Sequence, residues 1–359
     1  MAVQPSEWNK ESGKGILQYA VGGLLYMPAT TVKIADEIIN KRYAHLKSMV
    51  LCLEDSIGDD MVGKAEKCLV QILKTLDAAL QAGKITINDI PLIFVRIRTP
   101  EHLVHVGKLV NPFLHIITGF VFPKFDMTNC GLYIENFNNI SEKASSDLYM
   151  MPIIESKNAM YRQLRMENLL KVNDNLRLVN CNVLNIRVGC ADFCNIFGIR
   201  RNFTQSVHDI AVINDCLSDI INVFARNYVC SGPVWEYFNS QGIEGAWSEG
   251  LKNELRFDKL NGFIGKTCIH PSQLKYIQEN NLVTYEQYKD ATAILGMANG
   301  LVGVKKGYND NKMNEVKPHS KWARKIIGLA DVYGVLAEEE VDTENTRRPK
   351  EDTGVEDKE

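Results

Sequence analysis

Two carboxylates, Glu155 and Asp192, follow consecutive apolar runs of the sequence. If these runs are neighbouring strands of a parallel barrel, the two side chains lie side by side at the carboxyl ends of the strands. Two such carboxylates repel each other unless a cation neutralises them, and hard oxygen ligands suit octahedral Mg²⁺. Arg96 can hold a substrate carboxylate or an oxyanion through its planar guanidinium. Together these residues predict chemistry through an enolate, in which the metal polarises a carbonyl and a cation stabilises the negative oxygen.

Other polar side chains follow further apolar runs and add to this candidate site. They are Glu54 and Asp55 after the second run, Lys124 after the fourth and His270 after the eighth. Each has a structural explanation by itself, because an acid can cap the next helix and a histidine beside proline can fix a loop. Their joint placement favours a charged cavity, where ion pairing or a metal must offset desolvation. We expect Lys124 and His270 to contact the substrate.

Two other motifs do not support a nucleotide or zinc site. The Gly-Lys-Thr tripeptide at 265–267 would close a phosphate-binding loop only with a glycine at position 260, which is Leu260. Cys190 and Cys194 have a spacing that zinc sites use, but no second pair or nearby histidine completes a tetrahedron. The nine cysteines of the chain therefore indicate buried thiols in a reducing compartment.

Apolar, β-branched runs alternate with segments of helical period, which predicts repeated βα units. We expect strands at residues 24–28, 48–54, 92–97, 118–124, 149–155, 183–189, 228–232 and 262–266. Helical stretches between them include 32–42, 61–82, 208–226 and 235–253. Eight such units over about 250 residues are typical of an α/β TIM (β/α)₈ barrel. A doubly wound open sheet is the alternative, although it normally has fewer strands and no Gly-x-Gly-x-x-Gly motif follows the first strand.

The sequence after the eighth strand predicts an appendage to the barrel. We assign residues 1–282 to the barrel and 283–337 to a C-terminal helical extension with helices at 285–301 and 318–337. The last 22 residues, 338–359, contain ten acids and four bases. This charge without aromatic residues is typical of a disordered acidic tail.

Composition indicates a globular cytoplasmic protein. The 359 residues are 45% hydrophobic and 24% charged, which is enough to bury a large core. Neither a long apolar run nor a basic, then apolar, N-terminus indicates a membrane protein or a secreted one. The net charge of −3, without a clustered basic face, also argues against nucleic acid as a partner.

Six segments resemble, in order, the motifs of a known family. They are LCLEDSIGDD (51–60), FVRIRTP (94–100), GFVFPKF (119–125), MPIIES (151–156), GCADFCNIFG (189–198) and GFIGKTCIHPSQL (262–274). The sequence thus resembles the citrate lyase beta-subunit and malyl-CoA lyase group of the HpcH/HpaI aldolase superfamily. Its first-strand loop PATTVK and the segment SGPVWEYF (231–238) look more like a divergent carbon-carbon bond lyase branch, associated with tellurite-resistance gene clusters.

The resemblance implies that Glu155 and Asp192 bind Mg²⁺ and that Arg96 binds the substrate carboxylate and the oxyanion. Lys124 would line the rim of the site. The expected enzyme is a Mg²⁺-dependent carbon-carbon bond lyase of retro-Claisen or retro-aldol type, acting on a carboxylic acid or its acyl thioester. The alternative is a catalytically impaired barrel that binds a ligand or helps to assemble a biosynthetic complex.

The resemblance also assigns the remaining acids of the site. Glu54 and Asp55 would hold metal-bound waters or orient their neighbours. In the sister branch of pyruvate aldolases a histidine base occupies the position of Asp55. In the lyase branch a carboxylate of the C-terminal segment reaches into a neighbouring subunit, and within Lys-Met-Asn-Glu (312–315) the candidate is Glu315. A homotrimer or a multiple of it is therefore expected.

Overall fold

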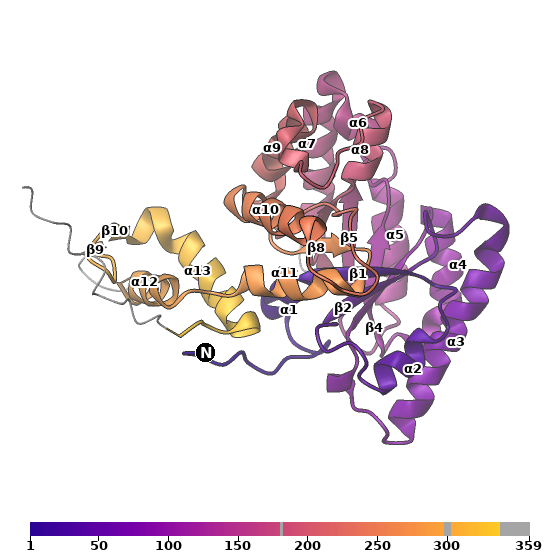
Figure 1. Ribbon diagram of the computed structural model, residues 1–359. Helices are drawn as coiled ribbons and strands as arrows, with labels where there is room; N and C mark the ends of the chain where they lie inside the picture. Colours follow the sequence, from indigo (N-terminus) through magenta and orange to yellow (C-terminus); the bar gives the residue numbers. More distant parts are fainter. Residues whose placement is uncertain (180–181, 298–302, 338–359) are drawn as a thin grey trace, which may run out of the picture.

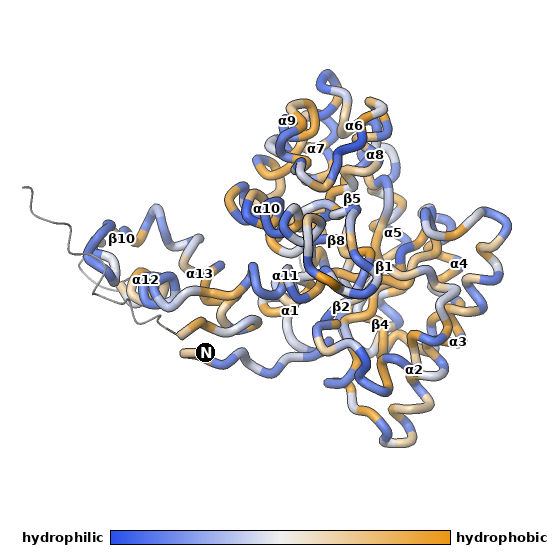
Figure 2. Tube along the Cα trace, in the orientation of Figure 1, coloured by the Kyte–Doolittle hydropathy of each residue, from blue (hydrophilic) through white to orange (hydrophobic). Residues whose placement is uncertain are grey.

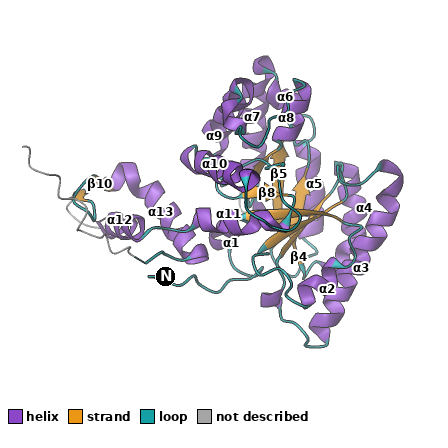
Figure 3. Ribbon diagram, in the orientation of Figure 1, coloured by secondary structure: helices purple, strands orange, loops and turns teal. Residues whose placement is uncertain are grey.

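The computed structural model describes residues 1–179, 182–297 and 303–337, and a sheet of eight parallel strands lies at its centre (Figures 1 and 3). The strands are β1 (Gly23–Pro28), β2 (Ser48–Cys52), β3 (Leu92–Arg96), β4 (Ile117–Phe122), β5 (Tyr149–Ile154), β6 (Ile186–Val188), β7 (Cys230–Ser231) and β8 (Lys266–Cys268). In the sheet they follow sequence order from β7 back to β1, and β8 then pairs with β1.

The two ends of this sheet meet beside β7. Gly232, directly after β7, forms a parallel bridge to Lys266 at the start of β8. The Gly232 N–H donates to the Gly265 carbonyl at 3.0 Å, and the Thr267 N–H donates to the Gly232 carbonyl at 3.3 Å. The predicted TIM barrel is therefore confirmed, and the open doubly wound sheet is wrong.

The eighth strand begins later than its predicted position at 262–266. Gly262 and Gly265 have φ angles of 94° and 71°, which place both in the left-handed region. A Cβ on Gly265 would also lie 2.2 Å from the carbonyl oxygen of Gly22. These glycines form the turn into the strand, because an extended strand cannot contain such φ angles. Lys266 consequently stands at the start of β8 instead of its carboxyl end.

Helices cover the outside of the barrel (Figure 3). They are α1 (Lys14–Ala20), α2 (Ile34–Ile39), α3 (Val62–Gln81), α4 (Pro100–Val110), α5 (Cys130–Ser141), α6 (Lys157–Met160), α7 (Arg162–Leu178), α8 (Cys190–Ile196), α9 (Ala211–Phe224), α10 (Ala246–Leu260) and α11 (Leu274–Asn281). Short 3₁₀ helices are η1 (Asp59–Met61), η2 (Ile87–Asp89), η3 (Asn111–Phe113), η5 (Val207–Asp209) and η6 (Pro271–Gln273). Among the described residues no helix is both long and apolar enough to cross a bilayer.

The helix predicted at 235–253 is wrong in its first half, because α10 begins only at Ala246. Trp235 is instead buried in the loop after β7, where its Nε1–H donates to the Trp247 carbonyl at 3.1 Å. The guanidinium of Arg201 lies 5.0 Å from the centre of its ring. Gly242, with φ of 72°, breaks any helix in this segment. The helix-like spacing of apolar residues in the first half of this segment thus came from loop residues that pack on the barrel.

The core has two layers because successive residues of a strand point to opposite sides. Phe94 and Val121 belong to a cluster that fills the barrel interior. Val95 and Phe120 belong to a larger cluster between the strands and the helices. Hydrophobic segments accordingly run along both strands and helices (Figure 2). At the carboxyl ends of the strands, the side chains on the inward-facing side must therefore face the mouth of the barrel.

The C-terminal segment extends away from the barrel (Figure 1). It contains α12 (Tyr285–Gly296), the two short strands β9 (Val304–Lys306) and β10 (Met313–Glu315), and α13 (Val316–Tyr333). Its apolar cluster also includes Val229 and Ile264 of the barrel. The two predicted helices are present, while residues 298–301 of the first and the predicted acidic tail at 338–359 lie outside the described residues. The boundary at 282 stays a prediction.

A buried ion network fixes β8 against α10. Lys266 Nζ lies 2.7 Å from Glu254 Oε1 and 2.6 Å from Asp258 Oδ2, and all three side chains are buried. Arg201 also pairs with Glu254, and His208 Nε2 lies 2.9 Å from Asp258 Oδ1. A buried charge is costly unless it is paired, so these partners depend on one another.

Replacing Lys266 with methionine should destabilise the fold strongly, by about 3–5 kcal/mol, because two buried carboxylates lose their shared cation. The free energy of unfolding in urea measures this loss. Lys252→Met is the control, since Lys252 pairs with Glu249 on the exposed face of α10 and should matter little. A loss no larger than that of the control would contradict the importance of the network.

Candidate active site

A cavity of about 440 Å³ opens at the carboxyl ends of the strands. Its lining comes from seven of the eight strands or the residues that follow them, and it includes Tyr26, Asp55, Arg96, Ile153, Glu155, Arg187, Gly189, Asp192, Val234 and Thr267. Catalytic sites of TIM barrels lie at this end. Four of the eight residues singled out by the sequence therefore share one cavity with a few that were not singled out; the four are Asp55, Arg96, Glu155 and Asp192.

Arg96 is the centre of the charged groups. Its Nη2 lies 2.7 Å from Glu54 Oε2, 3.0 Å from Asp55 Oδ2 and 3.3 Å from Glu155 Oε1. Burial opposes the charge of the guanidinium, but Glu155 and the other acids keep the pKa of Arg96 above its ordinary value. The last residue of β3 thus binds acids that follow two other strands, β2 and β5.

Lys124 completes this group of charged residues. It follows β4, which lies between β3 and β5. Its backbone has a φ of 49°, a left-handed conformation that is uncommon for a residue with a side chain. In this conformation its N–H donates to Glu155 Oε1 at 2.9 Å, while its Nζ lies 2.5 Å from Glu54 Oε1. Strain of this kind is found at functional sites and persists only where surrounding contacts hold it.

Glu155 and Asp192 both face the cavity. Burial raises the pKa of Glu155 to about 8, Arg96 opposes this shift, and the nearby Asp192 carboxylate adds to it. The absence of a side chain on Gly189 makes room for the acid, because a Cβ there would lie 2.0 Å from Glu155 Oε2. Gly189 also ends β6 and leads into α8, whose first turn carries Asp192.

This pair of carboxylates fits a divalent cation. The hydrogen bonds to Glu155 within the described chain all reach Oε1, whereas Oε2 occupies the space left by Gly189. Mg²⁺ is commonly held by one or two carboxylates and completes its shell with water and substrate oxygens. No group of three or more acids, histidines or cysteines with metal-holding geometry exists among the described residues. Any Mg²⁺ here would therefore keep several positions for water and substrate.

Glu54 and Asp55 are neighbours with opposite pKa shifts. Burial raises the pKa of Glu54, although Arg96 and Lys124 oppose the shift. Partial burial acts to raise the pKa of Asp55. The opposite effect of Arg96, Glu54 and Lys124 is larger, so the pKa of Asp55 is lowered. The contacts of both acids to Arg96 and Lys124 support the expectation that they orient their neighbours.

Comparison with known proteins identifies the family. The model of the family described as "C-C bond lyase of the TIM-barrel fold" matches residues 15–335. The chain belongs to this family. This match confirms the resemblance of the sequence to a carbon-carbon bond lyase branch. No match was found among curated proteins.

Solved structures related to this C-C bond lyase share its fold. CitE of Mycobacterium tuberculosis, in complex with magnesium, acetoacetate and coenzyme A, is 17% identical with a TM-score of 0.54, and the match covers 87% of this chain and 99% of that one. A citrate lyase of Burkholderia xenovorans LB400 is 14% identical with a TM-score of 0.62, and the match covers 88% and 93%. At these identities the likeness supports the barrel alone.

Four residues expected in the site are not part of this cavity lining. Glu54 and Lys124 contact residues that are, whereas His270 and Glu315 have other surroundings. The His270 ring stacks on Phe238, with centroids 4.5 Å apart, and its Nδ1 accepts the Ser272 N–H at 3.2 Å. His270 thereby caps η6 and fixes this loop, which is the structural role considered for it above. Its contact with the substrate stays a prediction. Glu315 ends β10 in the C-terminal extension, away from the barrel (Figure 1). If it acts at this kind of cavity, it must act in another copy of the chain.

Arg187 is the functional candidate that the sequence analysis missed. It is the middle residue of β6, pairs with Ile153 of β5 and lines the cavity. Its Nη2 donates to Thr267 Oγ1 at 2.7 Å, and its guanidinium lies 6.0 Å from the centre of the Tyr26 ring. An arginine within an otherwise apolar run was the available signal.

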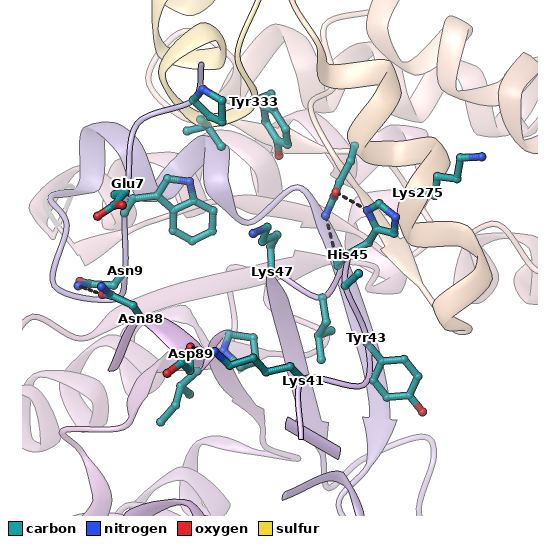
Figure 4. Close-up of a pocket in the computed structure, with 18 of the residues that line it drawn as sticks. Glu7, Asn9, Lys41, Tyr43, His45, Lys47, Asn88, Asp89, Lys275 and Tyr333 are labelled. Carbon is teal, nitrogen blue, oxygen red and sulfur yellow. Dashed lines mark hydrogen bonds and ion pairs between the residues drawn. The ribbon is translucent and has the colours of Figure 1, made fainter. Parts of the chain in front are cut away.

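A larger hollow, of about 910 Å³, lies at the opposite end of the barrel, before β2 and β3 (Figure 4). Its polar side chains pair with one another across the surface: Lys41 Nζ lies 2.6 Å from Asp89 Oδ1, and Asn9 bonds Asn88 at 2.7 Å. The amino ends of barrel strands usually serve stability. Size alone therefore does not make this hollow the active site.

The raised pKa of Glu155 predicts how stability depends on pH. The folded pKa is about 8, above the ordinary value of 4.5, so between these values the folded protein keeps a proton that the unfolded chain releases. In metal-free protein the unfolding free energy should therefore fall as pH rises through this interval, by at most about 1.4 kcal/mol per pH unit from this group.

Urea unfolding at pH 5.5 and pH 8.5, in the presence of EDTA, measures this dependence. Glu155→Gln provides the comparison because a glutamine does not titrate, and its unfolding free energy should fall less between the two pH values. Equal pH dependence in both proteins would show that Glu155 titrates near its ordinary pKa.

Proposed function

We propose that this C-C bond lyase uses Mg²⁺ to cleave or form a carbon-carbon bond beside a carbonyl, by retro-aldol or retro-Claisen chemistry. The substrate would be a carboxylic acid or its acyl thioester. The observation that carries the proposal is the pair Glu155 and Asp192 facing one cavity with Arg96. Mg²⁺ held by this pair would act as a Lewis acid toward a carbonyl oxygen.

The residues of the chain have separate parts in this chemistry. Arg96 would stabilise negative charge that develops on the substrate oxygen, since a fixed cation in a dry site needs no reorganisation. Glu54 and Asp55 hold the guanidinium in place through Nη2, and the left-handed Lys124 holds Glu155 through its backbone N–H. The buried carboxylates in turn keep Arg96 charged.

A solved relative supports the classes of cofactor and ligand proposed here. The Mycobacterium tuberculosis protein is a complex with magnesium, a small oxo acid and coenzyme A. We infer the same metal for this chain because its two cavity carboxylates suit Mg²⁺ independently.

Loss of the metal ligand should remove the activity. Asp192→Asn should weaken Mg²⁺ binding at least about 10-fold in calorimetry, because the amide supplies no charge. The same variant, and the native protein in EDTA, should lose turnover in an aldolase-type assay across 2-oxo acids and β-hydroxyacyl thioesters. Asp174→Asn, on the exposed side of α7, is the matched control and should behave like the native protein.

Two results would separate this function from its alternative. Undiminished turnover in EDTA would remove the metal from the mechanism. Binding of Mg²⁺ and a 2-oxo acid without any product in the whole screen would favour the ligand-binding or assembly barrel instead.

Glu315 generates a further prediction, which concerns assembly. We propose that the chain forms a homotrimer or a multiple of it, in which Glu315 of one copy reaches the cavity of another. Glu315→Gln and Asp192→Asn should each be inactive, but mixed assemblies should regain part of the activity because some sites contain neither change. Co-expression of the two variants with different tags, followed by the lyase assay, measures this recovery. A monomer in light scattering, or full activity of Glu315→Gln, would exclude the role.

A further inference from the structure

Arg187 differs from the other buried arginines of the described chain. Arg96 contacts three carboxylates, Arg165 contacts Asp215 and Asp219, and Arg201 contacts Glu254 and Glu236. Arg187 is 1% exposed, yet its hydrogen bonds go to neutral side chains: Thr267 Oγ1 at 2.7 Å, Asn185 Oδ1 at 3.5 Å and the hydroxyl of Tyr26. Its Nε is buried and has no hydrogen-bond partner among the described residues, as is also true of the other three arginines, so the difference lies in the missing acid.

This arrangement leaves a positive charge without a counter-ion among the residues that the structure describes. Arginine remains protonated in proteins, and an unpaired buried charge is costly. Burial lowers the pKa of Arg187, and burial also raises the pKa of Tyr26, so the adjacent phenol stays neutral and supplies no negative charge. A site that keeps such a cation against its cost is prepared for an anion that arrives from outside.

The position of Arg187 indicates which anion this is. Arg187 pairs with Ile153, and Glu155 follows two residues later on the same side of β5. Two residues of a strand span roughly 6–7 Å, so Arg187 starts one layer deeper in the barrel than the proposed metal ligands. Both line the same cavity of about 440 Å³. A ligand that reaches both must be small and must carry an anionic group at its far end.

We propose that Arg187 is the receptor for a second carboxylate, so that the substrate is a small dicarboxylate whose carbonyl end lies at Glu155 and Asp192. This assignment rests on the proposed lyase function and specifies its substrate class. The planar guanidinium matches a carboxylate through paired hydrogen bonds. Thr267 holds Nη2 in position, and the Tyr26 ring lies between the guanidiniums of Arg96 and Arg187, 5.9 Å and 6.0 Å away.

Arg96 and Arg187 would then divide two tasks. The Nη2 group of Arg96 is already occupied by three carboxylates, which suits it to the reacting end near the metal ligands. Arg187 has no acid to displace, so a substrate carboxylate can bind it without breaking an ion pair. Specificity arises because a substrate without the distal carboxylate would leave this cation buried and unpaired.

Matched 2-oxo acids test the proposal. Calorimetric titrations of the full-length protein with Mg²⁺ should compare 2-oxoglutarate with 2-oxopentanoate, which has the same chain length but lacks the distal carboxylate, and oxaloacetate with 2-oxobutanoate. The native protein should prefer the better-fitting dicarboxylate by about 10- to 100-fold over its matched acid. Arg187→Met should lose this preference but retain its affinity for the monocarboxylates. Arg187→Lys should keep part of it, and the exposed Arg177→Met, as control, should keep all of it.

Thermal unfolding of the ligand-free variants separates binding from a structural role. Arg187→Met removes an uncompensated charge, so it should unfold at the same temperature as the native protein or at a higher one. A markedly lower unfolding temperature would show that Arg187 serves the fold and would overturn the proposal. Equal affinity of the native protein for both acids of each pair, a preference that survives Arg187→Met, or tighter binding of inorganic phosphate would overturn it as well.

A failure of the lyase proposal can be distinguished from a failure of the proposal for Arg187. If Mg²⁺ does not bind and no 2-oxo acid is recognised, the proposed function fails, and succinate then tests Arg187 in metal-free protein. Succinate should raise the unfolding temperature of the native protein and of Arg187→Lys but not that of Arg187→Met. The same rise in all three proteins, or in none, would exclude Arg187 as a carboxylate receptor.

Discussion

The ion cluster around Arg96 is the interaction on which the mouth of the barrel depends. One nitrogen of a buried guanidinium binds the three acids that follow β2 and β5, and Lys124 after β4 contacts the same three acids. None of these groups could be buried alone, because each would keep an uncompensated charge. The cluster therefore fixes four strand ends relative to one another and places Glu155 against Gly189. The geometry proposed for the metal follows from this ion pairing.

Buried ion pairs have a different role on the outside of the barrel, between β8 and α10. Lys266 of β8 and Glu254 and Asp258 of α10 form a network of buried side chains, and none of the three lines the cavity at the mouth of the barrel. Its charges are satisfied internally, so it contributes to the closure of the barrel beside β8. Buried charge thus marks a functional site only where the charges border a cavity and remain incompletely paired. Arg187 meets both conditions, whereas Lys266 meets neither.

The barrel was predictable because each buried parallel strand is a short, nearly continuous apolar run, and such runs repeated eight times. The cluster at its mouth was predictable because carboxyl ends of parallel strands converge. The start of β8 could not be predicted in this way, since the hydrophobic pattern does not reveal that Gly262 and Gly265 turn the chain. Arg187 was missed for a related reason: a run that is apolar on both sides does not show which residues face inward. Only the pairing of Arg187 with Ile153 settles its direction.

The pKa shifts also separate charge stabilisation from proton transfer. By the resemblance of the sequence, Asp55 is at the position of a histidine base in pyruvate aldolases, but its pKa is lowered and it pairs with both Arg96 and Lys124. A general base works best with a pKa near the working pH, so Asp55 is poorly suited to that role. The acids at this rim instead hold Arg96 and Lys124 in place, and in the proposed scheme such a cation would stabilise an oxygen that becomes negative. In the proposed scheme the proton would therefore be moved by a group outside the Arg96 cluster, which is the chemical reason for considering an acid from another copy of the chain.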